Sequence, residues 1–210
     1  MPTETRVVCI SRDVAAGGET VGRAVAEALG FRYVDEEIVT SAADKIGVPV
    51  DLVADVETRR SLTQRVLEEV LANMGGASML SGTTPLLADR HASDDYRALI
   101  QQAINDTAGQ GQVVIVAHAS SQLLAGRPGV LRVFITASPE TLAARLAADG
   151  SLDETGAAKL VKEGSLARAD YLKRFYGIAR ELPTHYDLVV NTDVISPEDA
   201  AQLVLTACGR

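Results

Sequence analysis

Short apolar runs constrain the fold of this 210-residue chain more than any other feature of its sequence. The clearest are residues 6–11, 112–118, 130–136 and 186–192, which are rich in β-branched residues and nearly continuous in apolar character. Strands of this kind are covered on both faces, as in a parallel sheet flanked by helices. A shorter run, 31–35, is also interpreted as a strand. The sequence therefore predicts an α/β fold, a three-layer sandwich with a five-stranded parallel sheet between helices.

Amphipathic segments lie between these runs, and their ends carry helix-boundary signals. Apolar residues such as Val21 and Val25 recur at helical spacing after the first run, and Gly30 is placed to end that helix. Ser138 and Ser196 each precede a Pro-Glu pair, a pattern typical of a helix capped by serine with proline as its first residue. Strands alternating with such helices again indicate a parallel sheet.

Two stretches are less regular. Residues 75–92 have little periodicity and are rich in Gly, Ser and Thr, so we predict a loop there, with Ser93 capping the helix that follows. Residues 153–180 mix basic and acidic side chains and are interpreted as two helical segments. In residues 57–74 an apolar stripe at helical spacing is expected to pack either on the core or against a second subunit, which would make a homodimer.

The composition excludes several classes of protein. The chain has 28 acidic and 20 basic side chains, a net charge of −8, so it is not expected to bind nucleic acid through phosphate neutralisation. No apolar run approaches the roughly 20 residues of a membrane helix, and no secretory signal is visible, so we expect no membrane contact and a cytoplasmic location. Cys9 and Cys208 form no CxxC or Cys/His pattern, which argues against zinc and against a disulfide framework.

The most informative local unit is the turn between the first strand and the first helix, ISRDVAAGGETVGR. Gly17 and Gly18 lack side chains, so the backbone can approach a ligand closely, and the helix that follows offers unpaired N–H groups to an anion. Arg12 lies beside the turn. The turn therefore predicts a phosphate site, although an ordinary strand-to-helix turn with a packing Gly22 would look similar. The spacing matches neither GxGxxG nor GxxxxGK[ST].

Several segments resemble one known family. The string ISRDVAAGGETVGRAVAEALGFRYVDEEIV resembles the opening of the cytidylate-kinase-like proteins, a branch of the phosphate-loop nucleoside monophosphate kinases. VLRVFITASPETLAARL, ARADYLKRFYG and YDLVVNTDVISPEDAAQLVL are similar to the fourth strand and helix, the basic lid and the last strand and helix of that family. The resemblance implies one kinase-like domain over residues 1–210, with an acceptor-binding insertion at about 46–92 and a lid region at about 150–180.

The resemblance also implies a chemistry: transfer of the γ-phosphoryl group of ATP, with Mg²⁺, to a nucleoside monophosphate or similar small acceptor. The residues expected to hold the ATP phosphates are Arg12, Gly17, Gly18, Glu19 and Thr20. Those expected to close over the transferring group are Arg168, Lys173 and Arg174, whereas Arg145 would reach the same region or pair with Asp149. Asp35 and His118 are expected to face the acceptor, and no metal ligand is assigned, although Asp35 and Asp13 are the nearest carboxylates.

The sequence departs from the usual patterns at two places. A standard phosphate loop has Lys followed by Ser or Thr where this chain has Gly18 and Glu19, although openings of the cytidylate-kinase-like branch also lack that lysine. Relatives have VIVGRG where this chain has VIVAHAS, with His118. Glu19 would bring a negative charge to the phosphates unless it faces away or contacts magnesium. A second hypothesis is therefore a catalytically impaired nucleotide-binding or regulatory module. A dinucleotide-binding oxidoreductase is the third, and it is disfavoured by the missing GxGxxG spacing.

Overall fold

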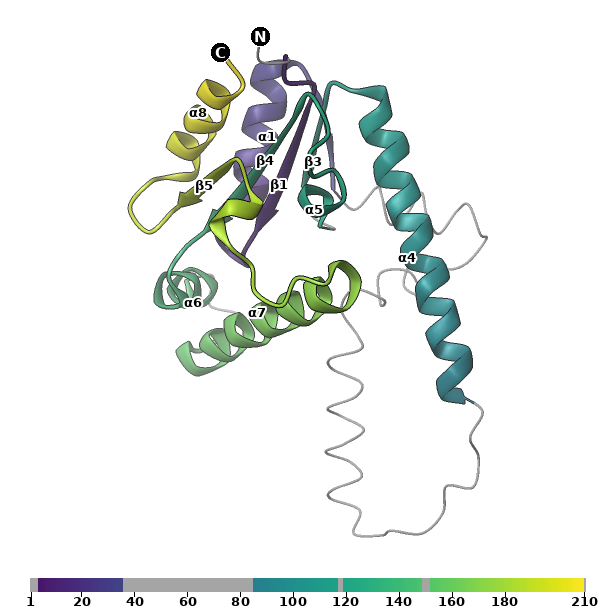
Figure 1. Cartoon of the computed structure of the whole chain (residues 1–210). Coiled ribbons are helices and arrows are strands. Elements are labelled where there is room, and N and C mark those ends of the chain that lie inside the picture. Colours follow the sequence, from purple (N-terminus) through teal and green to yellow (C-terminus); the bar gives the residue numbers. More distant parts are fainter. Residues whose placement is uncertain (1–3, 36–84, 117–118, 149–151, 210) are drawn as a thin grey trace. The chain divides into compact units, whose positions relative to one another are not determined.

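The computed structural model of the chain describes residues 4–35, 85–116, 119–148 and 152–209. It divides into two compact units, one made of Met1–Asp35 and Asn105–Arg210, the other of Glu36–Ile104. The first unit contains a five-stranded sheet with the order β2-β3-β1-β4-β5 (Figure 1). The strands are β1 (Val7–Arg12), β2 (Arg32–Val34), β3 (Val113–Val116), β4 (Val130–Thr136) and β5 (Leu188–Asn191).

Every neighbouring pair of strands is parallel, as the sequence predicts. The central strand β1 pairs on both sides, so that Ile10 lies beside Val116 in β3 and beside Val133 in β4. These side chains are fully buried, because both faces of the strand are covered. The last strand begins later than predicted. Asp187 lies ahead of it, and its carboxylate accepts from the backbone N–H of Arg132 at 2.9 Å in place of a ladder carbonyl.

Helices flank the sheet, which confirms the predicted α/β sandwich. In the first unit they are α1 (Gly18–Leu29), α5 (Ser120–Leu123), α6 (Pro139–Ala147), α7 (Glu154–Tyr176) and α8 (Pro197–Ala207), with a 3₁₀ turn, η1, at Pro183–His185. Helices α1 and α8 pack side by side, as do α6 and α7 (Figure 1). None of the helices in the described ranges is long and apolar enough to cross a membrane.

The predicted helix boundaries are confirmed where short-range chemistry sets them. Ser138 accepts a hydrogen bond from the N–H of Thr141, and Ser196 accepts one from Asp199, so both serines cap a helix that begins with proline. Gly30 ends α1 with φ 67°, a left-handed conformation that favours glycine, and its N–H donates to the carbonyls of the last turn.

Two predictions of local structure are wrong. Helix α4 (Pro85–Gln110) begins inside the stretch predicted as a loop at 75–92, and Ser93 lies within it instead of capping it. Proline is tolerated in a first helical turn, and the Leu, Ala and Arg residues that follow Pro85 are good helix formers. Residues 153–180 hold one helix, α7, rather than two. Asp153 caps its start, and the helix continues through its two internal glycines without a break. Residues 75–84 lie outside the described part of the chain.

The core fixes where α1 begins. Val21 and Val25 of α1 are fully buried in one cluster with residues of β1, β3, β4 and α8. Each buried aliphatic side chain of this size stabilises the fold by about 1.5–3 kcal/mol. A Cβ at Gly22 would lie 2.5 Å from Cγ2 of Val116, so α1 lies tightly against β3. The packing role of Gly22 is therefore real, and it holds the start of α1 at the carboxyl end of β1.

Candidate functional site

The loop between β1 and α1 lies at the carboxyl edge of the sheet, where open parallel sheets bind their ligands. The N–H of Asp13 donates to the carbonyl of Ile135 at 3.0 Å, and the N–H of Ala16 donates back to the carbonyl of Asp13 at 3.2 Å. Ala15 and Gly17 have positive φ values of 59° and 86°. The chain thus makes a closed turn that delivers the first amides of α1 to this edge. Gly17, at the N-cap, has no side chain to cover them.

The two consecutive glycines are required by different neighbours. A Cβ at Gly17 would lie 2.9 Å from Cγ of Pro197 in α8, in addition to the strain of its positive φ. A Cβ at Gly18 would lie 2.6 Å from Cβ and 2.7 Å from Cδ of Arg12. The side chain of Arg12 therefore lies directly across Gly18. The space that the two missing side chains leave is thus taken by Pro197 and by Arg12, and the approach of a ligand to this turn stays a prediction.

Glu19 does not project alone toward the place where phosphates would arrive. Nε of Arg12 donates a hydrogen bond to Oε1 of Glu19, so the two form an ion pair beside the first turn of α1. Their side chains are 25% and 44% exposed, respectively. Thr20, the last residue predicted to hold phosphates, is exposed on the same turn. The structure therefore brings together the five residues predicted to hold the donor.

The back of the loop is held by a residue whose role the sequence left open. Arg145 of α6 donates to the carbonyl of Ala15 at 3.2 Å, to the hydroxyl of Thr192 at 3.0 Å, and to the carbonyl of Thr192. The Thr192 hydroxyl in turn lies 3.0 Å from the carbonyl of Ala16. These contacts fix the carbonyls of Ala15 and Ala16, just ahead of the start of α1. The sequence signal for these contacts is a threonine, Thr192, directly after the last strand, and the structure shows that it is buried.

Asp13 is the carboxylate built into the loop itself. Thr136, the last residue of β4, donates its hydroxyl proton to Oδ2 of Asp13 at 2.6 Å. Burial raises the pKa of Asp13, and the Thr136 hydrogen bond and the positive charge of Arg168 offset this only in part. Asp13 therefore lies beside the candidate phosphate site, and its carboxylate interacts electrostatically with the positive charge of Arg168.

Arg168, predicted as a lid cation, is held in a cluster of its own. It donates from Nε and Nη2 to the two carboxylate oxygens of Glu181 at 2.9 and 2.7 Å, and from Nη2 to the hydroxyl of Tyr186 at 3.0 Å. Its guanidinium carbon also lies 5.3 Å from the ring centre of Phe134, which stacks on Tyr186. Burial alone would raise the pKa of Glu181, but the hydrogen bonds and charge of Arg168 outweigh it and lower that pKa.

The other two predicted lid cations, Lys173 and Arg174, do not lie on the side of α7 that carries Arg168. Lys173 and Arg174 are exposed, and Arg174 pairs with Asp170 at 2.8 Å. At about 100° per residue, positions 173 and 174 are turned by about 140° and 240° from Arg168. The three cations therefore do not share one face of the helix. Their spacing along the helix already separates them, and Arg168 is in addition held by Glu181 and Tyr186 from the segment after α7.

The residues predicted to face the acceptor are described only in part. Asp35 follows β2 and accepts a hydrogen bond from the hydroxyl of Tyr33 at 3.2 Å. Burial and the nearby charge of Asp35 raise the pKa of Tyr33 to about 12. His118, the stripe at 57–74 and most of the predicted insertion lie outside the described residues. Within the described residues no group of three or more His, Cys, Asp or Glu side chains is placed to hold a metal ion.

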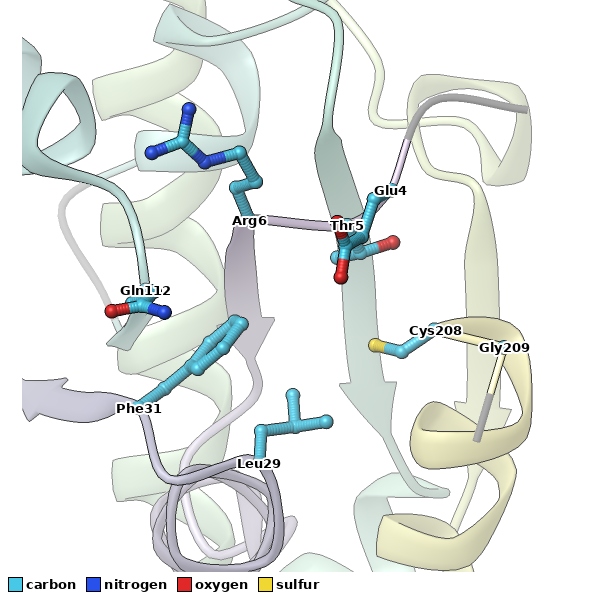
Figure 2. A pocket seen from close by; sticks show the side chains of 8 residues that line it. All are labelled: Glu4, Thr5, Arg6, Leu29, Phe31, Gln112, Cys208 and Gly209. Carbon is cyan, nitrogen blue, oxygen red and sulfur yellow. The ribbon is translucent and has the colours of Figure 1, made fainter. Parts of the chain in front are cut away.

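A hollow lies at the opposite, amino edge of the sheet (Figure 2). Its volume is about 390 Å³, and the residues that line it are Glu4, Thr5, Arg6, Leu29, Phe31, Gln112, Cys208 and Gly209. None of the predicted site residues is among them. The hollow is therefore distinct from the phosphate-loop region.

The chain is similar to known proteins in sequence and in fold. Residues 7–194 match the sequence profile of the cytidylate kinase-like family. No curated protein sequence matches the chain significantly. Among solved structures, an uncharacterized protein from Eubacterium ventriosum is 14% identical, with a TM-score of 0.67 over 98% of this chain and 99% of that one. Shikimate kinase from Bacteroides thetaiotaomicron is 13% identical, with a TM-score of 0.52 over 98% and 99%. These likenesses agree on the fold.

Proposed function

Because the chain belongs to the cytidylate kinase-like family, we propose that it is a nucleotide-binding phosphotransferase that transfers the γ-phosphoryl group of ATP to a nucleoside monophosphate or similar small acceptor. The family and the kinase fold support the coarser statement, a nucleotide-binding and kinase-like role. The observation that carries the proposal is the loop from Arg12 to Thr20, which places the start of α1 at the carboxyl edge of the sheet.

The donor phosphates would lie against the first amides of α1. A helix start offers N–H donors and the positive end of a dipole, and Gly17, at the N-cap, adds no side chain over them. Arg145 and Thr192 hold the loop from behind, so its amides are preorganised. Phosphoryl transfer mainly requires that the reacting groups are positioned and that their developing charge is stabilised. A rigid donor site of this kind would supply both.

Magnesium fits the donor atoms of this edge. Mg²⁺ prefers oxygen ligands and usually takes one or two carboxylates together with substrate phosphates. Asp13 in the loop would supply one such carboxylate, and bound Mg²⁺ would neutralise charge on the phosphates. Asp13 already accepts from Thr136, which orients its carboxylate.

Acceptor and lid residues complete the proposal. Asp35, oriented by Tyr33, and His118 would face the acceptor. Lys173 and Arg174 are exposed on α7 and would approach the transferring group, whereas Arg168 acts from its cluster through its charge on Asp13. A cytoplasmic location and a homodimer remain predictions.

An ADP-release assay with Mg²⁺, ATP and a panel of nucleoside monophosphates and small hydroxy acids tests the proposal. We expect turnover with at least one acceptor. The double variant Lys173→Ala/Arg174→Ala should lose about tenfold or more, because each cation that stabilises developing charge contributes about 1.4 kcal/mol or more. The control Lys159→Ala, on an exposed position of the same helix, should keep full turnover. Absence of turnover with every acceptor would contradict the proposal.

A second candidate is a nucleotide-binding module without catalysis. Two observations favour it: glycine stands where the standard loop has lysine, and Arg168 is already bound by Glu181 and Tyr186. This candidate predicts that ATP raises the melting temperature without release of ADP. At a ligand concentration of 100 times Kd the stabilisation would be about 2.7 kcal/mol. The same assay, run beside a thermal melt, separates the two candidates.

A further inference from the structure

The phosphate loop of this chain carries an arginine and a glycine in exchanged positions. The standard pattern GxxxxGK[ST] has glycine at its first and sixth positions and lysine at its seventh. When Gly17 is taken as the sixth position, the first is Arg12 and the seventh is Gly18. The loop therefore keeps one cation and two glycines, but the cation stands where the first glycine normally is.

The structure gives this exchange a physical reason. A Cβ at Gly18 would lie 2.6 Å from Cβ of Arg12, 2.7 Å from its Cδ and 3.2 Å from its Cγ. Cβ moves only with the backbone, and the backbone of Arg12 is paired in β1 opposite Ile135 of β4. A side chain at 18 is therefore incompatible with a side chain at 12 unless β1 or α1 shifts. The arginine stem occupies the volume in which a lysine at 18 would begin.

The charge of Arg12 is held by a partner that a ligand can replace. The guanidinium lies beside the first turn of α1 and pairs with Glu19, and both side chains are partly exposed. Ion pairs of this exposure contribute about 0–1 kcal/mol, so breaking one costs little. A triphosphate carries more negative charge than one carboxylate, and arginine binds phosphate oxygens through two parallel hydrogen bonds.

We propose that Arg12 supplies the cation that a standard phosphate loop takes from its lysine, and that Glu19 is its partner only until a nucleoside triphosphate binds. The inference rests on the proposed function, since it names the residue that recognises the β- and γ-phosphates there. Gly18 is then not a lost lysine. It is the residue that gives the Arg12 side chain its path to the phosphates.

Titration calorimetry with ATP and Mg²⁺ tests the role of the pair. Arg12→Met should weaken ATP binding about 10- to 100-fold, the loss expected for a charged hydrogen bond. It should change AMP binding by less than about threefold, because AMP lacks the β- and γ-phosphates. Glu19→Gln should tighten ATP binding about threefold, because Arg12 loses its competing partner. The control pair Lys159 and Glu163 on α7, changed to Met and Gln, should leave both affinities unchanged.

Exchanging the two residues back is the sharper experiment. Gly18→Lys alone should destabilise the protein, because its stem meets the Arg12 stem. Arg12→Gly alone should bind ATP as weakly as Arg12→Met. The double variant Arg12→Gly/Gly18→Lys removes the contact and moves the cation to position 18. It should fold and recover ATP binding to within about tenfold of the wild-type affinity, since one charged contact replaces another.

The outcomes separate the inference from the proposed function. If the wild type binds ATP and Arg12→Met binds it equally well, Arg12 has no such role while the proposed function stands. If Glu19→Gln weakens ATP binding, Glu19 contributes to the bound state and the exchange of partners is wrong. If the wild type binds no nucleoside triphosphate, the proposed function fails together with the inference. The single variants decide the matter even if the double variant does not fold.

Discussion

Two arginine–glutamate pairs lie at the carboxyl edge of the sheet, and they differ in how completely they are satisfied. Arg168 makes two hydrogen bonds to Glu181 and a third to Tyr186, and the side chains of the pair are 23% and 21% exposed. Arg12 makes a single contact with Glu19, whose side chain is 44% exposed. The same residue types therefore serve different purposes. A fully bonded arginine holds elements together, whereas a singly bonded one remains available to a ligand.

Removal of the arginine from each pair should give the largest difference between the two pairs in the free energy of unfolding. Arg168→Met leaves the half-buried carboxylate of Glu181 without its partner, so the free energy of unfolding should fall by about 3 kcal/mol. Arg12→Met should lower it by less than about 1 kcal/mol, because Glu19 is free to turn into water. Urea denaturation measures both. Equal losses for the two variants would remove the distinction between the pairs.

A smaller effect is expected from the arginine that supports the loop from behind. Arg145→Met removes three hydrogen bonds, to the carbonyls of Ala15 and Thr192 and to the Thr192 hydroxyl, and each contributes about 0.5–1 kcal/mol. The free energy of unfolding should fall by about 2 kcal/mol, and amide hydrogen exchange of residues 13–20 should accelerate. Arg127→Met, at an exposed position, is the control. Unchanged exchange in the loop would show that Arg145 does not order it.

The two regions should also respond oppositely to pH. Burial raises the pKa of Asp13, so the folded state holds that proton more tightly and the group destabilises the fold increasingly as pH rises above 3.8. Asp13→Asn should therefore be more stable than the wild type at pH 7, with a gap that narrows toward pH 3.8. Arg168 lowers the pKa of Glu181, so Glu181→Gln should be less stable at pH 7, with a gap that narrows as pH falls below 4.5.

Urea denaturation at several pH values measures these differences for each variant against the wild type. The pairwise comparison cancels the titration of all other groups. If Asp13→Asn were less stable than the wild type at pH 7, the carboxylate would be stabilising and its pKa would not be raised.

The smallest effect is expected at Glu19. Glu19→Gln should change the free energy of unfolding by no more than about 0.5 kcal/mol, because a partly exposed ion pair with a single contact contributes little. A thermal melt with and without ATP checks both this and the tightened binding inferred above. A loss of more than 1 kcal/mol without ligand would place this pair beside the Arg168 pair as a structural one.

The sequence predicts the sheet well because the signal is local to each strand. Continuous β-branched runs such as 112–118 mark buried parallel strands, and Ser138 and Ser196 mark helix starts by their own side-chain chemistry. The turn glycines are equally local, because Gly17 needs a positive φ. All of these features could be found without knowledge of which segments meet.

The remaining features depend on contacts between distant segments. A charged helix such as α7 looks uniformly solvated in sequence, and only the return of Glu181 and Tyr186 shows that Arg168 is held by three hydrogen bonds. The start of α4 at Pro85 is a local exception: the Gly and Ser residues around it favour the prediction of a loop, although good helix formers follow Pro85. The contact of Arg12 with Gly18 joins two residues of one motif, yet it follows from the angle between β1 and α1.

The most direct test is a crystal structure of the chain with a non-hydrolysable ATP analogue and Mg²⁺. The account predicts that the β- and γ-phosphates lie against the amides of residues 17–20, and that the Arg12 guanidinium has left Glu19 and contacts a phosphate oxygen. A triphosphate bound at any other edge of the sheet, or an Arg12 still paired with Glu19 beside the bound phosphates, would contradict it.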